Sequence, residues 1–171
     1  MTTRSLFSEC ARGRIAEILA EVYAPLLATL SAEKAEELLG AWRLYEAAIH
    51  DEPDTVGSAG FLTFLDDSII GFGSWDPRGW PDVGHIGHNC IRPSYQRRGL
   101  GRLQVEVILG YLRRKGFRSA CVRTDEHPFF TPARQMYVAC GFQEVGREPG
   151  TLLDDCDTVV YELELSGDQT G

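Results

Sequence analysis

Two glycines and three arginines lie close together in the middle of the chain, in the run Gln96-Arg97-Arg98-Gly99-Leu100-Gly101-Arg102, here named the basic loop. Glycine allows the backbone to approach a ligand closely and to adopt conformations that a side chain forbids. The loop lies between a predicted strand and a predicted helix. Free N–H groups at a helix N-terminus, the helix dipole and nearby arginines together form an anion site, so this spacing fits a pyrophosphate.

The glycine spacing by itself also fits a simple tight turn. The sequence lacks the GxxxxGK[ST] pattern of a Walker loop, and the basic loop lacks the third glycine and the downstream acid of the dinucleotide fingerprint. The context favours a ligand site. The strand before the loop ends in Ile91-Arg92-Pro93, and the helix after it is long enough to supply a dipole.

The elements that position this loop follow from hydrophobic periodicity. Apolar residues at helical spacing predict a helix from Ile15 to Leu30, kinked or split at Pro25, and a second helix after the N-cap Ser31. Runs of β-forming residues predict a hairpin and a third strand. These strands span Phe61–Leu65, Ile69–Trp75 and Val83–Ile91, and Asp66-Asp67-Ser68 separates the first two.

The second half of the chain alternates helices and strands. The predicted order is a helix from Gly99 to Lys115 ended by Gly116, a strand over Ser119–Thr124, a helix with N-cap Thr131 that ends at Gly141, a strand beginning over Phe142–Val145, and a last strand around Val159 to Leu165. Residues 166–171 read as a frayed tail. We therefore expect one α/β (α+β) domain over residues 1–171, with a mixed sheet.

Composition narrows the function. The chain has 171 residues, 43% of them hydrophobic and 25% charged, which excludes disordered, coiled-coil and collagen-like proteins. The net charge of −8 disfavours nucleic acid and anionic membranes as partners. The segment from Arg92 to Arg118, however, holds eight basic residues and one acid, a local charge of +7 against −15 elsewhere. Either a local anion site or an exposed helix face balanced by acidic neighbours explains this segment.

Cysteine usage and targeting signals point to a cytoplasmic protein. The five cysteines are odd in number and form no CxxC pair, so we expect neither a disulfide framework nor a zinc cluster. Strand alternation places His85 opposite His88 and Cys90, so we expect no metal there. No run of 18 apolar residues and no signal-peptide core is present.

Two sequence blocks resemble the GNAT family of N-acetyltransferases. The run from Ile91 to Gly101, IRPSYQRRGLG, is similar to the family's acetyl-CoA-binding motif, Q/R-x-x-G-x-G/A after a strand that ends V-x-P. The block from Ala133 through Tyr137 to Phe142 resembles the family's A-x-x-x-Y-x-x-x-G-F segment. The similarity covers residues 83–147. It implies a mixed, mostly antiparallel central sheet flanked by helices, with splayed central strands.

The same resemblance implies acetyl-CoA as cosubstrate. Its pyrophosphate would lie on the backbone of the basic loop, and its pantetheine arm beside the strand end at Asn89, Cys90 and Ile91. The arm would bind like an additional strand between Val83–Ile91 and Ser119–Thr124. The chain departs from the family pattern at Phe130, where many members carry an asparagine that helps to hold the arm. Cofactor affinity is then expected to depend more on the basic loop.

Tyr137 occupies the position of the family's general acid. A phenol has a pKa of about 10 and a thiol one near 8.5. Transfer of a proton from the phenol to the leaving thiolate therefore costs only about 2 kcal/mol, before the site changes the pKa of either group. The alternative for Tyr137 is a core tyrosine near the end of a helix.

His85 stands where many family members have a strand glutamate, and where serotonin N-acetyltransferase also has a histidine. A neutral imidazole can accept a proton, directly or through water, at physiological pH. His88 is the other candidate base on the opposite strand face, and a hydrogen-bonded strand histidine without a catalytic role is the alternative for His85.

The resemblance implies direct transfer of the acetyl group to a primary amine of a small molecule or peptide, in a ternary complex. A thiol-acyl intermediate on Cys90 or Cys140 is the covalent alternative. Four aromatic residues either line an acceptor pocket or belong to the core: Trp42, Tyr45, Trp75 and Trp80. Four acidic residues either attract a cationic amine or lie in solvated turns: Asp76, Asp82, Asp125 and Glu126. The rival functions are a non-catalytic CoA-binding module and a nucleic-acid-binding domain. Dimers are common in the family, which allows a homodimer.

Overall fold

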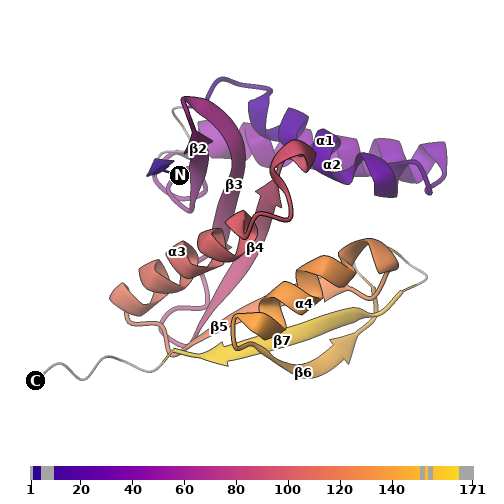
Figure 1. Cartoon of the computed structure of the whole chain (residues 1–171). Helices are drawn as coiled ribbons and strands as arrows, with labels where there is room; N and C mark the ends of the chain where they lie inside the picture. The colour runs from indigo at the N-terminus through magenta and orange to yellow at the C-terminus, as the bar shows by residue number, and fades with distance from the viewer. Residues whose placement is uncertain (1, 5–9, 151–152, 154–155, 166–171) are drawn as a thin grey trace, which may run out of the picture. The chain divides into compact units, whose positions relative to one another are not determined.

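A computed structural model describes residues 2–4, 10–150, 153 and 156–165. The chain forms two compact units (Figure 1). The first comprises residues 1–74 and 88–100, and the second residues 75–87 and 101–171. A single domain over residues 1–171 stays a prediction, and the tail 166–171 lies outside the described residues.

Seven strands form a mixed, mostly antiparallel sheet in the hydrogen-bonded order β1-β2-β3-β4-β5-β7-β6, with helices beside the strands in each unit. The strands β4 (Val83–Ile91) and β5 (Ser119–Asp125) pair in parallel, over Val83 to Ile86 against Ser119 to Val122. This architecture confirms the predicted fold class.

In the first unit, α1 (Arg14–Leu27) and α2 (Ala32–Asp51) form a helical pair. Residues at helical spacing on α1 are fully buried, among them Ile15, Ile18 and Leu19. Pro25 lies inside the last turn of α1, and the helix ends three residues earlier than predicted. Ser31 caps α2 as predicted, because its hydroxyl accepts the backbone N–H of Lys34 at 3.2 Å.

The hairpin of β2 (Gly60–Leu65) and β3 (Ser68–Asp76) has a two-residue turn instead of the predicted three. Asp66 and Asp67 have φ of 47° and 62°, the left-handed conformation that such turns require, and Ser68 already pairs with Leu65. The sequence did not predict β1 (Thr2–Arg4), which pairs antiparallel with β2. A three-residue strand is too short for a periodic signal.

The second unit contains α3 (Leu100–Arg114, from Gly101 on), β5, α4 (Thr131–Ala139), β6 (Gln143–Glu148) and β7 (Thr158–Glu164). The buried face of α3 includes Val105, Ile108 and Leu112. A Cβ atom on Gly84 would lie 2.4 Å from a methyl of Leu112, so β4 approaches α3 closely because it lacks a side chain there. Gly116, with φ of 81°, follows the end of α3 as predicted.

The start of α4 corrects a prediction. Thr131 is the first helical residue and not the N-cap, which is Phe130 and makes no side-chain capping bond. A short 3-10 turn, η3 (Pro128–Phe130), precedes the helix, and the Thr131 hydroxyl instead accepts a hydrogen bond from Arg134 at 3.2 Å.

Among the described helices, none combines the length and the apolar composition that crossing a bilayer requires.

Candidate active site

The basic loop follows β4 and a short 3-10 turn, η2 (Pro93–Tyr95), and runs into α3. The side-chain amide of Gln96 donates to the carbonyl oxygen of Ile91 at 2.8 Å. The guanidinium of Arg98 donates to the carbonyl oxygen of Ser94 at 3.0 Å and lies over the ring of Tyr95. The loop is therefore tied by its own side chains to the end of β4 and to η2.

The loop backbone is left-handed at two positions, Arg97 with φ of 58° and Gly99 with φ of 77°. Left-handed residues placed close together turn successive N–H groups toward one side, the arrangement that binds anions in loops. A Cβ atom on Gly99 would meet nothing within 4 Å, so the backbone is open to a ligand there. The 15-residue helix α3 begins at the next residue, and its dipole favours a negative charge at this end.

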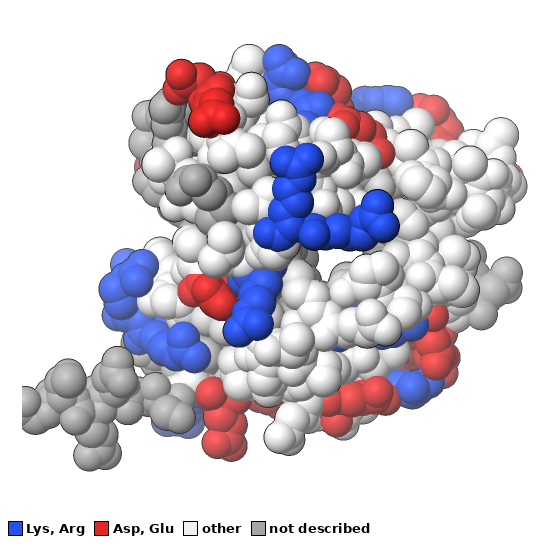
Figure 2. Space-filling model, in the orientation of Figure 1, with Lys and Arg blue, Asp and Glu red and all other residues white. Residues whose placement is uncertain are grey.

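Three arginines of the basic segment between Arg92 and Arg118 have acidic partners. Arg92 pairs with Glu17 and Glu21, Arg102 with Glu106, and Arg118 with Asp82. Arg97 and Arg98 have no acidic partner within the part of the chain that the structure describes. Blue side chains extend from the segment that joins β4 to α3 in the space-filling view (Figure 2). Positive charge is therefore left at the loop, as it is around the end of α3, where Arg113, Arg114 and Lys115 also have no acidic partner among the described residues.

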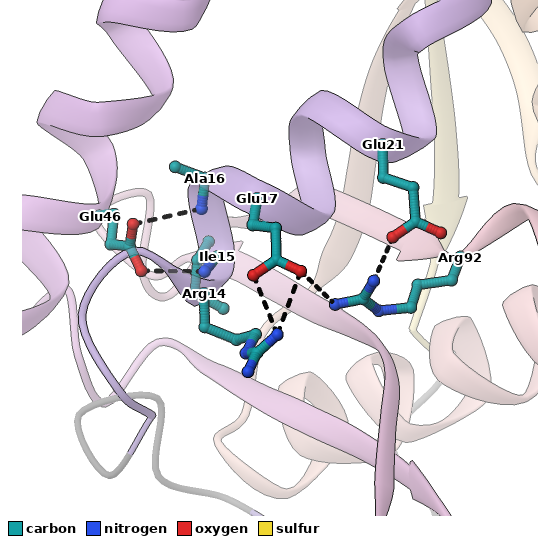
Figure 3. A network of polar contacts seen from close by, with 7 residues as sticks. All are labelled: Arg14, Ile15, Ala16, Glu17, Glu21, Glu46 and Arg92. Atoms are coloured by element: carbon teal, nitrogen blue, oxygen red, sulfur yellow. Dashed lines mark hydrogen bonds and ion pairs between the residues drawn. The ribbon is translucent and has the colours of Figure 1, made fainter.

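A polar network holds Arg92, the residue after β4, in place (Figure 3). The guanidinium of Arg92, at the end of β4, donates to the Glu21 carboxylate and lies 3.4 Å from Glu17, both on α1. Glu17 also accepts from Arg14 at 2.9 Å. Only 17% of the Arg92 side chain is exposed, so this arginine serves as an anchor of the strand end to α1 and not as a free surface charge.

The strand residues expected beside a pantetheine arm differ in their exposure. Cys90 and Ile91 are buried, and Asn89 is half-buried. Burial raises the pKa of the Cys90 thiol to about 12 and also raises the pKa of Cys140. A thiol that stays protonated is a poor nucleophile, which disfavours the thiol-acyl alternative at both residues.

His85 on β4 lies beside a charged pair from β5 and β6. The Nη1 of Arg123 lies 3.2 Å from the Nδ1 of His85, while the Nε and Nη2 of Arg123 donate to the Glu148 carboxylate at 3.1 and 3.3 Å. Burial and the nearby Arg123 charge lower the pKa of His85, against smaller opposing effects of Asp76 and Glu162. The ring is therefore neutral at pH 7, the state that a proton acceptor needs.

His88 has different surroundings. Its ring packs against Tyr45 and Phe72, with centroid distances of 4.9 and 5.8 Å, and its backbone N–H donates to the Ser74 hydroxyl at 2.8 Å. Burial lowers the pKa of His88 to about 4. His88, the other candidate base, is thus a half-buried ring packed against two aromatic side chains.

Tyr137 lies on α4 and is 5% exposed. Its ring packs edge-on against Phe142, with centroids 5.7 Å apart, and its carbonyl oxygen accepts the N–H of Phe142 at 3.1 Å. The tyrosine and the glycine-phenylalanine end of its motif are thus packed together. Both candidate roles, the general acid and the core tyrosine, are compatible with this position.

The aromatic and acidic candidates for an acceptor site have largely structural surroundings. Trp42 and Trp75 are buried, whereas Trp80 is 64% exposed and its indole N–H donates to the Lys115 carbonyl at 3.1 Å. The acids Asp76, Asp82 and Glu126 have arginine partners, in that order Arg78, Arg118 and Arg147. Asp125 is buried and accepts the Thr158 hydroxyl at 2.7 Å. Three of the four acids are therefore already neutralised.

Sequence analysis missed Arg123 and Glu148. Parallel pairing sets Cys121 opposite His85, and strand alternation then puts Arg123 on the same face of β5. Glu148 reaches that face from β6, which pairs with β7. Only the strand order could have identified these neighbours.

Residues 23–142 of the chain match the family model of the acetyltransferase (GNAT) family. No curated protein matches the chain at a significant level of sequence similarity. Three solved structures have similar folds. A GNAT-family protein from Desulfovibrio desulfuricans has a TM-score of 0.70 at 18% identity, covering 96% of this chain and 99% of its own.

The other two structures cover less of the chain. A GNAT-family acetyltransferase from Elizabethkingia anophelis, with acetyl-CoA bound, has a TM-score of 0.56 at 17% identity over 62% of this chain and 75% of its own. The ribosomal-protein-S18-alanine N-acetyltransferase of Escherichia coli has a TM-score of 0.53 at 22% identity over 63% of this chain and 68% of its own. At these identities the similarity concerns the fold.

Proposed function

The chain belongs to the GNAT family of acetyltransferases, and we propose that it transfers the acetyl group of acetyl-CoA to a primary amine by direct attack. The observation that carries this proposal is the basic loop. Its two left-handed residues, Arg97 and Gly99, lie at the start of α3, and the loop arginines Arg97 and Arg98 have no acidic partner among the described residues.

These residues fit the pyrophosphate of acetyl-CoA. The N–H groups of Arg97 to Arg102 supply donors at a helix N-terminus, and the arginine side chains supply charge. In the proposed complex the pantetheine arm lies along Asn89, Cys90 and Ile91 of β4. Gln96 keeps the loop attached to the end of that strand through its bond to the Ile91 carbonyl. The cosubstrate supplies the activated acetyl thioester.

Tyr137 is the proposed general acid, which gives its phenol proton to the departing thiolate. A phenol and a thiol differ by about 1.5 pKa units, or about 2 kcal/mol, so this transfer needs little tuning by the site. Packing against Phe142 holds the tyrosine ring near the end of α4. A rigidly held acid is in position without further ordering.

His85 is the proposed base, which takes a proton from the acceptor amine directly or through water. The lowered pKa of His85 keeps the ring neutral at pH 7. His88, the alternative base, is enclosed by Tyr45 and Phe72. Direct attack is preferred over a covalent enzyme intermediate because burial raises the pKa of both candidate thiols, Cys90 and Cys140.

The proposed acceptor is a small molecule or a peptide with a primary amine. The E. coli enzyme with a similar fold is named for an alanine of a ribosomal protein as its acceptor. A strongly cationic acceptor gains little from Asp76, Asp82 or Glu126, because each has an arginine partner. A homodimer stays a prediction, to be checked by light scattering.

Calorimetry at low salt tests the first half of the proposal, and a panel of amines followed by CoA release tests the second. We expect binding of CoA and acetyl-CoA, and acetyl-CoA-dependent turnover with at least one class of amine. Absence of cofactor binding would contradict the whole proposal. Binding without hydrolysis or transfer across a broad panel would favour the rival, a non-catalytic CoA-binding module.

A further inference from the structure

The side chain of Arg123 uses all three nitrogens of its guanidinium in an ordered way. Its Nε and Nη2 donate to the two carboxylate oxygens of Glu148. Its Nη1 lies 3.2 Å from the Nδ1 of His85 and 3.5 Å from the sulfur of Cys121. The pair with Glu148 thus aims the remaining nitrogen at one atom of the histidine ring.

The chemistry of arginine settles which partner gives the hydrogen. A guanidinium has donors only and keeps its charge at all accessible pH values. The Nδ1 of His85 must therefore accept, and a neutral ring in this contact carries its single proton on Nε2. A ring with protons on both nitrogens has no lone pair to offer and loses the contact.

We propose that Arg123 is a positioning residue for His85, which fixes the Nε2–H tautomer and leaves Nδ1 as the sole basic nitrogen of the ring. This inference rests on the proposed function and deepens the role of the base. His85 then takes the amine proton at Nδ1: the amine N–H bond breaks, the Nδ1–H bond forms, and the bond from Arg123 is released.

The charged groups around the ring are consistent with this role. Asp76 and Arg78 approach from the end of β3 and the turn after it, Glu162 from β7, and Arg123 from β5. Arg123 lowers the pKa of Glu148, so the carboxylate stays charged and keeps its hold on the guanidinium around neutral pH. Once protonated, His85 faces the Arg123 cation, and their repulsion favours passing the proton on to water.

The ion pair of Arg123 and Glu148, here named the clamp, contributes little to the stability of the fold. Its residues can therefore be replaced. The Arg123 and Glu148 side chains are 42% and 45% exposed, and pairs this exposed contribute about 0–1 kcal/mol. Replacement of Arg123 therefore removes the contact to His85 without unfolding the chain. Arg78 offers a matched control, because its charge also lowers the pKa of His85 although no hydrogen bond joins it to the ring.

The test is a nitrogen-15 NMR titration of the histidine rings in the full chain without acetyl-CoA or acceptor, with His85→Gln to identify the signal. We expect the Nε2–H tautomer in the unmodified chain. In Arg123→Met we expect both tautomers and a higher His85 pKa, because the Arg123 charge lowers it in the unmodified chain. Arg78→Met should keep the Nε2–H tautomer, and Glu148→Gln should weaken the preference by releasing the clamp.

A Nδ1–H tautomer in the unmodified chain, or an Arg123→Met variant with unchanged tautomer and pKa, overturns the proposal. Once an acceptor is known, the acid limb of the kcat/KM profile should move to higher pH in Arg123→Met by the shift that NMR measures. An unchanged limb would overturn the catalytic use of the contact. The NMR result does not depend on acetyl transfer, so failure of the proposed function is recognised separately, by absent cofactor binding or turnover.

Discussion

Glu46 on α2 caps the N-terminus of α1, because its carboxylate accepts the backbone N–H of Ile15 at 2.9 Å and that of Ala16 at 3.2 Å (Figure 3). The N-cap residue itself is Gly13, which has no side chain to offer. A carboxylate at the positive end of a helix also complements its dipole. The buried position of Glu46, 5% exposed, thus has a structural reason.

Replacing Glu46 by alanine should destabilise the protein by about 2–3 kcal/mol, because a buried and a part-buried N–H group lose a charged acceptor. Glu46→Gln, which keeps one acceptor oxygen, should lose less. Urea unfolding followed by circular dichroism measures both. Glu36→Ala on the same helix removes an exposed pair with Arg43 and should cost less than about 1 kcal/mol. Equal losses in the Glu46 and Glu36 variants would contradict the capping role.

Gly71→Ala should destabilise the fold by about 2 kcal/mol or more, as overpacking does in well-packed interiors. A Cβ atom there would lie 2.1 Å from the carbonyl oxygen of Cys90 and 3.0 Å from the Cα of Ile91, and backbone atoms cannot rotate away. Gly40→Ala in α2 is the control, since nothing lies within 4 Å of its Cβ. It should be neutral or stabilising by up to about 1 kcal/mol, and thermal unfolding of the two variants should therefore diverge.

Stability should fall as the pH drops below 6.5, in part because of His88. Its folded-state pKa of about 4 lies below the ordinary value, so the unfolded chain takes up the proton first. The stabilisation is complete above pH 6.5 and is lost progressively as the pH falls toward 4. Between pH 7 and pH 5 the loss from this residue amounts to about 2 kcal/mol. In a His88→Gln variant, urea unfolding should show a correspondingly weaker pH dependence, and an identical dependence would refute the assignment.

Gly99→Glu should abolish binding of CoA in calorimetry, because it adds a negative charge at the proposed pyrophosphate site. Gly116→Glu provides the matched control. Gly99 and Gly116 have φ of 77° and 81°, and neither has an atom within 4 Å of an added Cβ. Both variants therefore carry similar backbone strain, of about 1 kcal/mol, and only the first should lose the ligand. Similar affinities in the two variants would place the ligand elsewhere.

Tyr137→Phe should lower turnover by about 10²–10⁴-fold, the usual contribution of a general acid, while CoA affinity changes little. The comparison variant is Tyr161→Phe, which removes the hydroxyl of another buried tyrosine, outside the motif. The rate of CoA release, measured with an amine that the unmodified chain acetylates, should be normal in Tyr161→Phe. Full activity in Tyr137→Phe would assign the tyrosine to the core alone.

Several elements were predictable from the sequence because their signals are local. Val83–Ile91 has the predicted bounds, Ser31 caps the predicted helix, and Gly116 follows the end of α3. The basic loop was predictable for the same reason, since its glycines and arginines are contiguous and lie between two recognisable elements. Its matches to the family motif needed no knowledge of distant contacts.

Other features depend on which distant segments meet. The sequence alone could not show that Glu17 and Glu21 pair with Arg92, or that Arg97 and Arg98 have no acidic partner among the described residues. Composition counts charges but does not show which of them form pairs. It identified His85 but not Arg123, which lies 38 residues away and reaches the ring only through the parallel register of β4 and β5. Local order along a chain determines periodicity, caps and turns, whereas hydrogen bonds and ion pairs act over a few ångströms in space. The neighbours that tune the candidate base were therefore decided by the tertiary structure.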